Sequence, residues 1–105
     1  MQVAPNVHRL EFAIDTKPMA MYVLAGDYLI LIDSGLPATP EEIYLPAIQA
    51  LGRRPDEVRL VIITHADADH IGGNAAVRQF FPNALLACHA QDARWASDPA
   101  VIMVT

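Results

Sequence analysis

The chain has 105 residues, a length that allows one domain with a modest core. Its net charge of −5 argues against a surface that binds nucleic acid through phosphate contacts, because such a surface needs clustered Lys and Arg. Hydrophobic residues make up 53 % and the mean hydropathy is +0.26, which is apolar for so short a chain. Two interpretations compete: an unusually buried α/β core, or a fragment whose apolar face is covered by something outside this chain.

The single cysteine, Cys88, excludes an intrachain disulfide and suits a reducing compartment, so we expect a cytoplasmic protein. Because Cys88 lies in the apolar run 84–88, we expect a buried side chain rather than a reactive thiol. Residues 1–9 lack the pattern of a signal peptide, and no apolar run approaches the roughly 20 residues of a membrane span. We therefore expect neither a membrane nor a nucleic-acid partner.

The N-terminal third of the chain predicts a series of strands. Apolar and polar residues alternate in the first of them, a period typical of a half-buried strand. Residues 16–18 predict a turn, and Gly26-Asp27 suits a two-residue hairpin of type II′. The last strand ends abruptly in Asp33. The expected strands are residues 8–14, 21–25 and 28–33.

A helix is predicted to follow, with Thr39 as its cap. The sequence Thr-Pro-Glu-Glu from Thr39 to Glu42 has the pattern of a capping box, in which the glutamate reaches back to the cap. Pro46 should kink or break the helix, because its ring clashes with the carbonyl four residues earlier. Gly52 is the expected C-cap. The apolar face of this helix is expected to comprise Ile43, Ala47, Ala50 and Leu51.

The remaining elements alternate between strand and helix. Residues 60–63 are apolar on both sides, which predicts a central strand covered on both faces. A helix over 75–81 is stopped by Pro82-Asn83, and a buried strand is expected at 84–88. Residues 89–95 are expected to start a further helix. A β-meander followed by α, β, α and β predicts an α/β layer built on a mixed sheet.

The stretch VIITHADADHIGGN, residues 61–74, places His65, Asp67, Asp69 and His70 directly behind the central strand. Two imidazoles and two carboxylates form a nitrogen and oxygen ligand set that fits Zn²⁺, and also Fe or Mn. Residues 65, 67 and 69 share one side if the segment stays extended, and a dication would remove the repulsion between the two carboxylates.

The alternative for this stretch is a capping loop in a plain α/β domain. Asp69 would cap the following helix, Asp67 would be solvated and the two histidines would be incidental. The strand in front and Gly72-Gly73 behind favour the ligand cluster, because these glycines let the backbone come close and open the next helix.

Two motifs resemble the metallo-β-lactamase-fold hydrolases. THADADHIGG is similar to their signature Thr-His-x-His-x-Asp-His-x-Gly-Gly, and LIDSG at 31–35 is similar to the Asp-Thr-Gly strand end that precedes it. The resemblance extends from about residue 7 to the region of residue 89. It implies an α/β fold: the N-terminal half of an αββα sandwich, with a mixed sheet and flanking helices. Residues 1–105 are then an apparently truncated N-terminal half of such a domain.

The resemblance also implies roles for particular residues. His65 resembles a ligand of the first metal, and Asp69 and His70 resemble ligands of the second. Asp67 stands where many members have histidine, so it either ligates or only shapes the first site. Asp69 would also orient the attacking water, which makes it the catalytic candidate. Asp33 resembles a buried acid beneath the site that orients the ligands, with a strand-end turn former as the alternative.

The function implied is that of a metal-dependent hydrolase, in which a metal-activated water attacks a small ester, thioester, lactone, amide or phosphodiester. Two zinc ions are expected in the complete protein. The alternative is a non-catalytic metal-binding or dimerising module that lacks the second half of the site. We expect the chain alone to be inactive or weakly active and to form a homodimer through its exposed sheet face. His8 and His89 are not carried over as ligands and are expected at a strand position and at a helix start or surface.

Overall fold

The computed structural model describes residues 2–14, 16–35, 38–64, 74–89 and 101–104. Within them, seven strands form one sheet in which every strand lies beside its neighbours in sequence. The first four strands pair antiparallel and the last four, from β4 on, pair parallel. The strands are β1 (Gln2–Ala4), β2 (Val7–Ile14), β3 (Lys17–Ala25), β4 (Leu29–Ile32), β5 (Val58–Ile62), β6 (Leu85–His89) and β7 (Val101–Val104).

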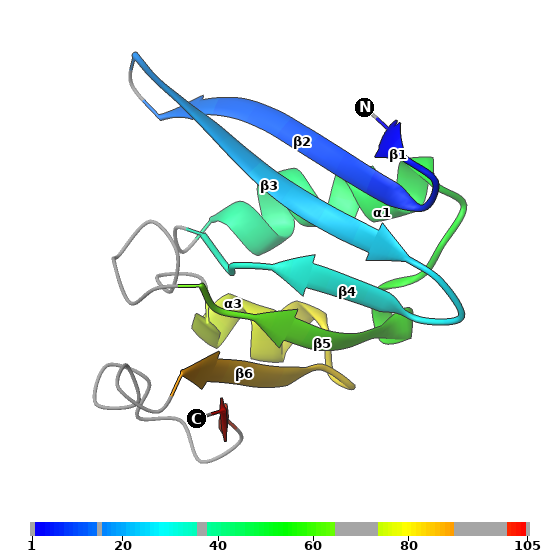
Figure 1. The fold of residues 1–105 in the computed structure, drawn as a ribbon, viewed down its shortest axis with the longest axis vertical. Helices are drawn as coiled ribbons and strands as arrows, with labels where there is room; N and C mark the ends of the chain where they lie inside the picture. The colour runs from blue at the N-terminus through cyan, green and yellow to red at the C-terminus, as the bar shows by residue number, and fades with distance from the viewer. Residues whose placement is uncertain (1, 15, 36–37, 65–73, 90–100, 105) are drawn as a thin grey trace.

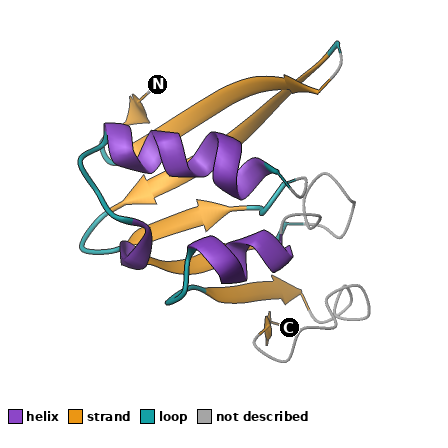
Figure 2. Cartoon of the chain, turned by 180° about the vertical axis from the view of Figure 1, so that it is seen from behind, coloured by secondary structure: helices purple, strands orange, loops and turns teal. Residues whose placement is uncertain are grey.

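The helices lie on one face of this sheet. The π-helical turn η1 (Pro40–Tyr44) runs into α1 (Leu45–Ala50), and the 3₁₀ turn η2 (Pro55–Glu57) leads into β5. The helix α3 (Asn74–Phe80) connects β5 to β6. Figure 1 shows the helices behind the sheet, and Figure 2 shows them in front when the molecule is turned by 180°. The mixed sheet with flanking helices that the sequence predicts is therefore confirmed.

The core lies between the helices and one face of the sheet. Its fully buried helical side chains include Tyr44 and Ile48 on η1 and α1, and Val77 on α3. Ile63 and Phe81, which directly follow β5 and α3, are buried as well. The strands contribute most of the other buried side chains, which include Met21, Val23, Leu29, Leu31, Val58, Val61 and Leu86. All described helices are too short or too polar to span a membrane.

Two predictions about the first strands are wrong. Residues 17 and 18 do not form a turn but belong to β3, where they pair with Ile14 and Ala13. β4 pairs only with residues 22–25 of β3, so Pro18 lies where one side of its strand is open and a missing N–H is tolerated. The connection from β3 to β4 is not a two-residue turn of type II′. Ala25 pairs with Leu29 across three residues, and Gly26 lacks the positive φ that this turn requires.

The helix after Asp33 also differs from its prediction at the start. Thr39 already has helical dihedral angles, and its side chain makes no capping hydrogen bond, so the predicted capping box is wrong. The amide of Glu42 donates to the carbonyl of Ala38 at 2.9 Å, so the helical hydrogen bonding already includes Ala38, before Thr39. Gly52 has φ +73° and its amide donates to the Gln49 carbonyl at 3.0 Å, which confirms the C-cap.

The kink or break predicted at Pro46 is found as a change of hydrogen-bonding pattern and not as a break, because η1 runs directly into α1. The amide of Leu45 donates to the carbonyl of Pro40, five residues back, so the turn before Pro46 is wider than an α-helical turn. Tyr44 and Ile48, which lie four residues apart, are fully buried. The predicted face of Ile43, Ala47, Ala50 and Leu51 is therefore displaced by one residue: Ala50 is exposed, the other three are partly buried, and Leu51 packs against the core.

The later elements match the predictions more closely. The strand predicted at 60–63 is β5, the helix at 75–81 is α3 and the strand at 84–88 is β6, each displaced by one or two residues. His89 is the last residue of β6, so it does not start a helix, and the rest of the helix predicted over 89–95 lies outside the described residues. β7 is a strand that the sequence pattern did not predict.

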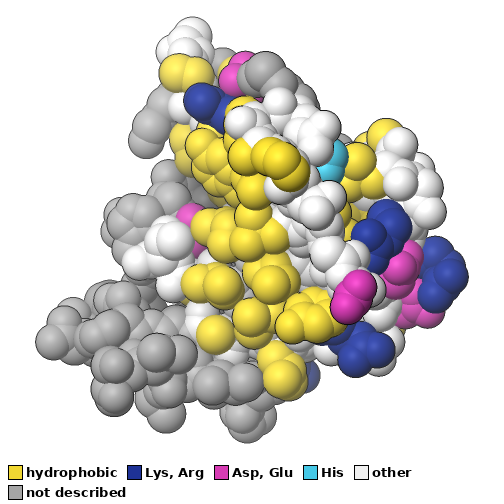
Figure 3. Space-filling view, turned by 45° about the vertical axis from the view of Figure 1, so that its right-hand side comes forward, with side chains coloured by type: hydrophobic (Ala, Val, Ile, Leu, Met, Phe, Trp, Pro, Cys, Tyr) yellow, Lys and Arg dark blue, Asp and Glu magenta, His cyan; other side chains and the backbone are white. Residues whose placement is uncertain are grey.

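Apolar side chains gather on the sheet face opposite the helices. The register places Tyr22, Leu24, Ile30, Ile32, Leu60, Ile62 and Leu85 on this face. Most of them are partly buried, and Leu85 is 47 % exposed. Figure 3 shows a band of yellow hydrophobic side chains on this surface. The prediction that β5 is covered on both faces is therefore wrong for the described elements, because the helices cover only one.

Candidate functional site

The carboxyl ends of β4, β5 and β6 meet at one edge of the sheet, because these strands are parallel and in register at Ile32, Ile62 and Ala87. The ladder continues for one residue beyond β4 and β5. The Asp33 amide donates to the Ile62 carbonyl at 2.7 Å, and the Ile63 amide donates to the Ala87 carbonyl at 2.7 Å. Open α/β sheets bind their ligands at this edge. The predicted motif therefore begins where a site is expected.

Asp33 connects the ends of β4 and β5 through its side chain. Its Oδ1 accepts from the Thr64 amide at 2.7 Å, and its two oxygens accept from the Thr64 hydroxyl at 3.0 and 2.8 Å. Asp33 is only 5 % exposed, whereas Thr64 is exposed. Hydrogen bonds to an ionised carboxylate are among the stronger ones in proteins. Asp33 thus holds the residue that directly precedes His65 in the chain.

The backbone at Asp33 turns sharply out of the strand. Asp33 has φ +67° and Gly35 has φ +75°, both in the left-handed region. A Cβ on Gly35 would lie 2.6 Å from the Oγ1 and Cγ2 atoms of Thr39, so only glycine fits here without a shift of the helix start. The backbone of Asp33 therefore forms the strand-end turn considered from the sequence, and its carboxylate contacts Thr64 at the next strand end. Its role in orienting the predicted ligands stays a prediction.

Tyr44 holds the same turn from the helix side. Its hydroxyl lies 2.7 Å from the carbonyl oxygen of Ile32 and 2.8 Å from that of Asp33, and it donates its one proton to this pair. Burial, and then the negative charge of Asp33, raises the pKa of Tyr44 far above its ordinary value. The phenol consequently stays protonated and remains a donor over the physiological pH range.

The predicted ligands His65, Asp67, Asp69 and His70 lie outside the described residues, so the structure does not place them relative to one another. Within the part of the chain that the structure does describe, no group of three or more His, Cys, Asp or Glu residues could hold a metal ion. The chemistry of the four predicted donors, two imidazoles and two carboxylates, fits zinc, iron or manganese.

Of the predicted site residues, Asp33 lies within the part of the chain that the structure describes. The two histidines not carried over as ligands are placed in strands: His8 lies within β2 and His89 ends β6, and Cys88 precedes it in β6.

Two residues of this edge were missed from the sequence, Tyr44 and Thr64. A signal for Tyr44 was present, because it lies four residues before Ile48 and a buried tyrosine needs a partner for its hydroxyl. The signal for Thr64 was its place between the last apolar residue of a strand and a predicted ligand. Neither partner could be named without the geometry of the turn at Asp33.

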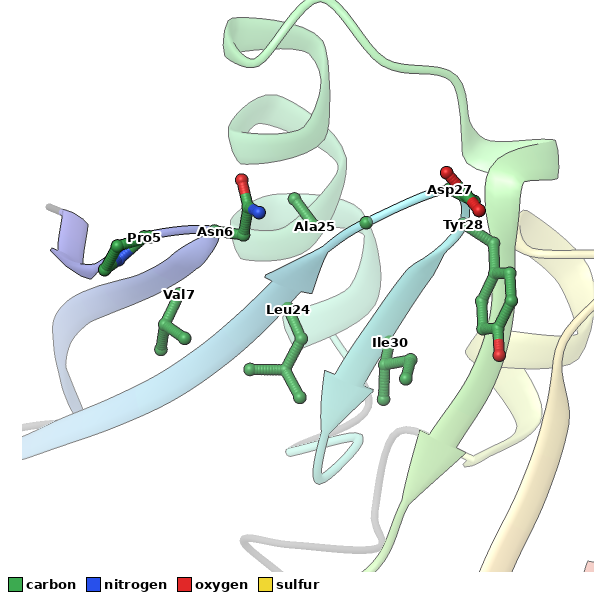
Figure 4. A pocket seen from close by; sticks show the side chains of 9 residues that line it. Pro5, Asn6, Val7, Leu24, Ala25, Asp27, Tyr28 and Ile30 are labelled. Atoms are coloured by element: carbon green, nitrogen blue, oxygen red, sulfur yellow. The ribbon is translucent and has the colours of Figure 1, made fainter.

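A surface hollow of about 430 Å³ lies at the opposite end of β4, as Figure 4 shows. Its described lining residues include Asn6, Leu24, Asp27 and Tyr28. Asp27 is the one ionisable carboxylate among them, and the lining includes no histidine, cysteine or basic residue. The hollow therefore lacks a cluster of groups able to bind a metal or transfer protons, and the sheet edge at Asp33 is the stronger candidate site.

Comparison with known proteins identifies the family of the chain. Residues 16–102 match the model of the Metallo-beta-lactamase superfamily. The chain is 39 % identical over 49 residues to the anti-Pycsar protein Apyc1 of Paenibacillus sp. (strain J14), an alignment that covers 47 % of this chain and 18 % of that protein.

Solved structures give the same result over most of the chain. A metallo-beta-lactamase of Cronobacter sakazakii, a HARLDQ-motif mutant, superposes with a TM-score of 0.74 at 26 % identity, over 90 % of this chain and 35 % of that one. BJP-1, a subclass B3 metallo-beta-lactamase of Bradyrhizobium japonicum, superposes with a TM-score of 0.71 at 28 % identity, over 88 % and 33 %. The chain thus spans about a third of each of these structures. The resemblance seen in the two sequence motifs is confirmed, and the chain belongs to the metallo-β-lactamase superfamily.

Proposed function

We propose that this chain carries part of the active site of a metal-dependent hydrolase that acts on a small molecule. The observation that carries the proposal is the contact between Asp33 and Thr64 at the carboxyl edge of the sheet. It fixes the start of the segment that contains His65, Asp67 and Asp69, in a chain that belongs to a superfamily whose members are typically zinc-dependent.

The chain's own residues have distinct tasks in this proposal. His65, Asp67, Asp69 and His70 would hold the metal, with zinc as the first choice and iron or manganese as alternatives. When bound, the metal acidifies water for attack on the substrate and stabilises the negative charge that develops. Asp69 would also orient the attacking water, and Asp33 would keep the ligand segment in place through Thr64.

The substrate class follows from the names of the relatives and from the charge of the chain. Two of the solved relatives are metallo-beta-lactamases, so a β-lactam is the first substrate to assay. Esters, thioesters, lactones and phosphodiesters follow, because the same attack on a carbonyl or phosphoryl centre serves all of them. The net charge of −5 favours a small substrate over a nucleic acid.

The test begins with metal binding. Purified chain, stripped of metal and titrated with Zn²⁺, should bind it, and His65→Ala should weaken binding at least tenfold. His8→Ala is the matched control, since His8 lies in β2 and is not among the predicted ligands. Equal zinc affinity of His65→Ala and His8→Ala would contradict the proposal.

Turnover separates the enzyme from the second candidate, a non-catalytic metal-binding or dimerising module. This candidate is favoured by one observation: the chain spans about a third of the solved relatives, so the groups that the rest of those proteins supply are not within these residues. Hydrolysis that is lost in Asp69→Asn supports the enzyme. Zinc binding without hydrolysis of any member of the panel supports the module as the function of these residues alone, in line with the expected weak or absent activity of the chain by itself.

A further inference from the structure

We propose that Tyr44 is a positioning residue of the site, and that it acts through Asp33 on Thr64. The proposed link comprises three residues from three places in the sequence: the last turn of η1, the end of β4 and the end of β5. Its importance for metal binding rests on the function proposed above, but the link itself can be tested without any metal.

Asp33 has a strained backbone conformation. A non-glycine residue with φ +67° is in a sterically unfavourable conformation, and aspartate is among the residues that tolerate it best. Asp33 is the first residue after β4, so the left-handed turn lies at the residue whose carboxylate contacts Thr64. A change of this turn is expected to move the carboxylate relative to Thr64.

Tyr44 holds this turn. The hydroxyl of Tyr44 is shared between the two carbonyl oxygens that flank the turn, those of Ile32 and Asp33. Tyr44 is fully buried among core side chains, so its ring cannot leave without opening a large cavity. A carbonyl buried without a donor costs free energy, and Phe at this position would leave both without this one.

Asp33 is bonded at its backbone and at its side chain. The backbone of Asp33 is held to Ile62 by its amide and to Tyr44 by its carbonyl, while its carboxylate holds Thr64. Contacts with the end of β5 and with η1 thus fix the position of Asp33. Among the described residues, the Tyr44 hydroxyl bonds to the carbonyls of Ile32 and Asp33 and not to Thr64, so its effect on Thr64 would pass through Asp33.

The test is amide hydrogen exchange, measured by NMR in Tyr44→Phe. We expect exchange at the Thr64 amide to accelerate about tenfold relative to the amide of Ile63, which bonds to Ala87 on β6 and lies next to it in the chain. Tyr28→Phe is the matched control, because Tyr28 is 50 % exposed and lies at the other end of β4. Equal acceleration at Thr64 and Ile63 would show that Tyr44 only stabilises the fold, and would overturn the proposal.

A reciprocal variant tests the same link without altering the core. Thr64→Val removes the hydroxyl at the exposed end, and we expect faster exchange at the Asp33 amide, which donates to Ile62. We also expect Tyr44→Phe and Thr64→Val to have non-additive effects, although the two residues share only Asp33. Additive effects together with an unchanged Asp33 amide would contradict the link.

Zinc alone serves as the probe for the metal-binding consequence. Tyr44→Phe should weaken Zn²⁺ affinity about three- to tenfold at unchanged stoichiometry, and Tyr28→Phe should leave it unchanged. If the unmodified chain binds no zinc while Thr64 exchange responds to Tyr44→Phe, the proposed function fails and the link stands. If zinc binds and Tyr44→Phe alters neither exchange nor affinity, the positioning role fails and the metal site stands.

Discussion

Replacement of Asp33 by alanine is the most informative single change at the sheet edge. It removes the acceptor of both Thr64 donors and leaves an alanine in a left-handed conformation. Each hydrogen bond to a charged group contributes about 1.5 to 3 kcal/mol net, and the lower value applies here because Thr64 is exposed and water can replace the acceptor. The left-handed alanine adds about 1 kcal/mol.

The two lost hydrogen bonds and the backbone cost arise from one side chain and are not additive, so we expect less than their sum: a loss of about 3 kcal/mol in the free energy of unfolding. For a chain of this size the melting temperature should fall by about 12 to 24 °C. Asp33→Asn keeps the tolerance for the left-handed conformation and a neutral acceptor, so its loss should be smaller, about 1 kcal/mol.

Urea unfolding followed by circular dichroism measures these differences. Asp27→Ala is the control, because Asp27 is exposed at the opposite end of β4 and its carbonyl, which accepts from Arg53, is retained. It should change the free energy of unfolding by less than about 0.5 kcal/mol. The reasoning is refuted if Asp33→Ala is as stable as Asp27→Ala, or if Asp33→Asn is the less stable of the two Asp33 variants.

Three further outcomes are expected. Gly35→Ala should destabilise the chain by about 2 kcal/mol or more in urea unfolding, since its Cβ would meet Thr39 at 2.6 Å, whereas Gly52→Ala, with φ +73° but no atom within 4 Å of its Cβ, should cost only about 1 kcal/mol. Because burial raises the pKa of Tyr44, its contribution to stability is fully present below the unfolded pKa of about 10 and is lost as the pH rises above that value. The free energy of unfolding, measured as a function of pH, should therefore decline less steeply above that value in Tyr44→Phe. The isolated chain should self-associate through its apolar sheet face, and Leu85→Lys, at the most exposed position of that face, should raise the monomer fraction in sedimentation velocity; unchanged association would place the contact elsewhere.

Much of the fold could be predicted because its strands are apolar runs separated by Gly, Pro and acidic residues. β2, β5 and β6 were found within two residues, and Pro46 marked the place where the helix changes its hydrogen-bonding pattern. The errors arose where the conformation of one residue depends on its packing against another. Thr39 begins a sequence typical of a capping box, but its side chain lies against Gly35, and the helical hydrogen bonding already includes Ala38.

The candidate site was predictable in part for the same reason. Asp33 could be identified because an acid at the end of an apolar strand is an unusual local signal. Tyr44 could not be assigned, because the buried face of the helix is displaced by one residue from the predicted one, and the partners of its hydroxyl are backbone carbonyls at the turn of Asp33. The metal ligands and their number, the cytoplasmic location and the homodimer stay predictions.

The order of the strands in the sheet, from β1 to β7, is the same as their order in the chain. Each strand can therefore pair with the one made just before it, and no strand must wait for a distant segment to be inserted between its neighbours. Such a sheet can grow from one side during synthesis on the ribosome, with β2 and β3 as the early hairpin. The contact between Asp33 and Thr64 forms only after β5 has joined, so the candidate site would be assembled late, on a scaffold whose first four strands are already in place.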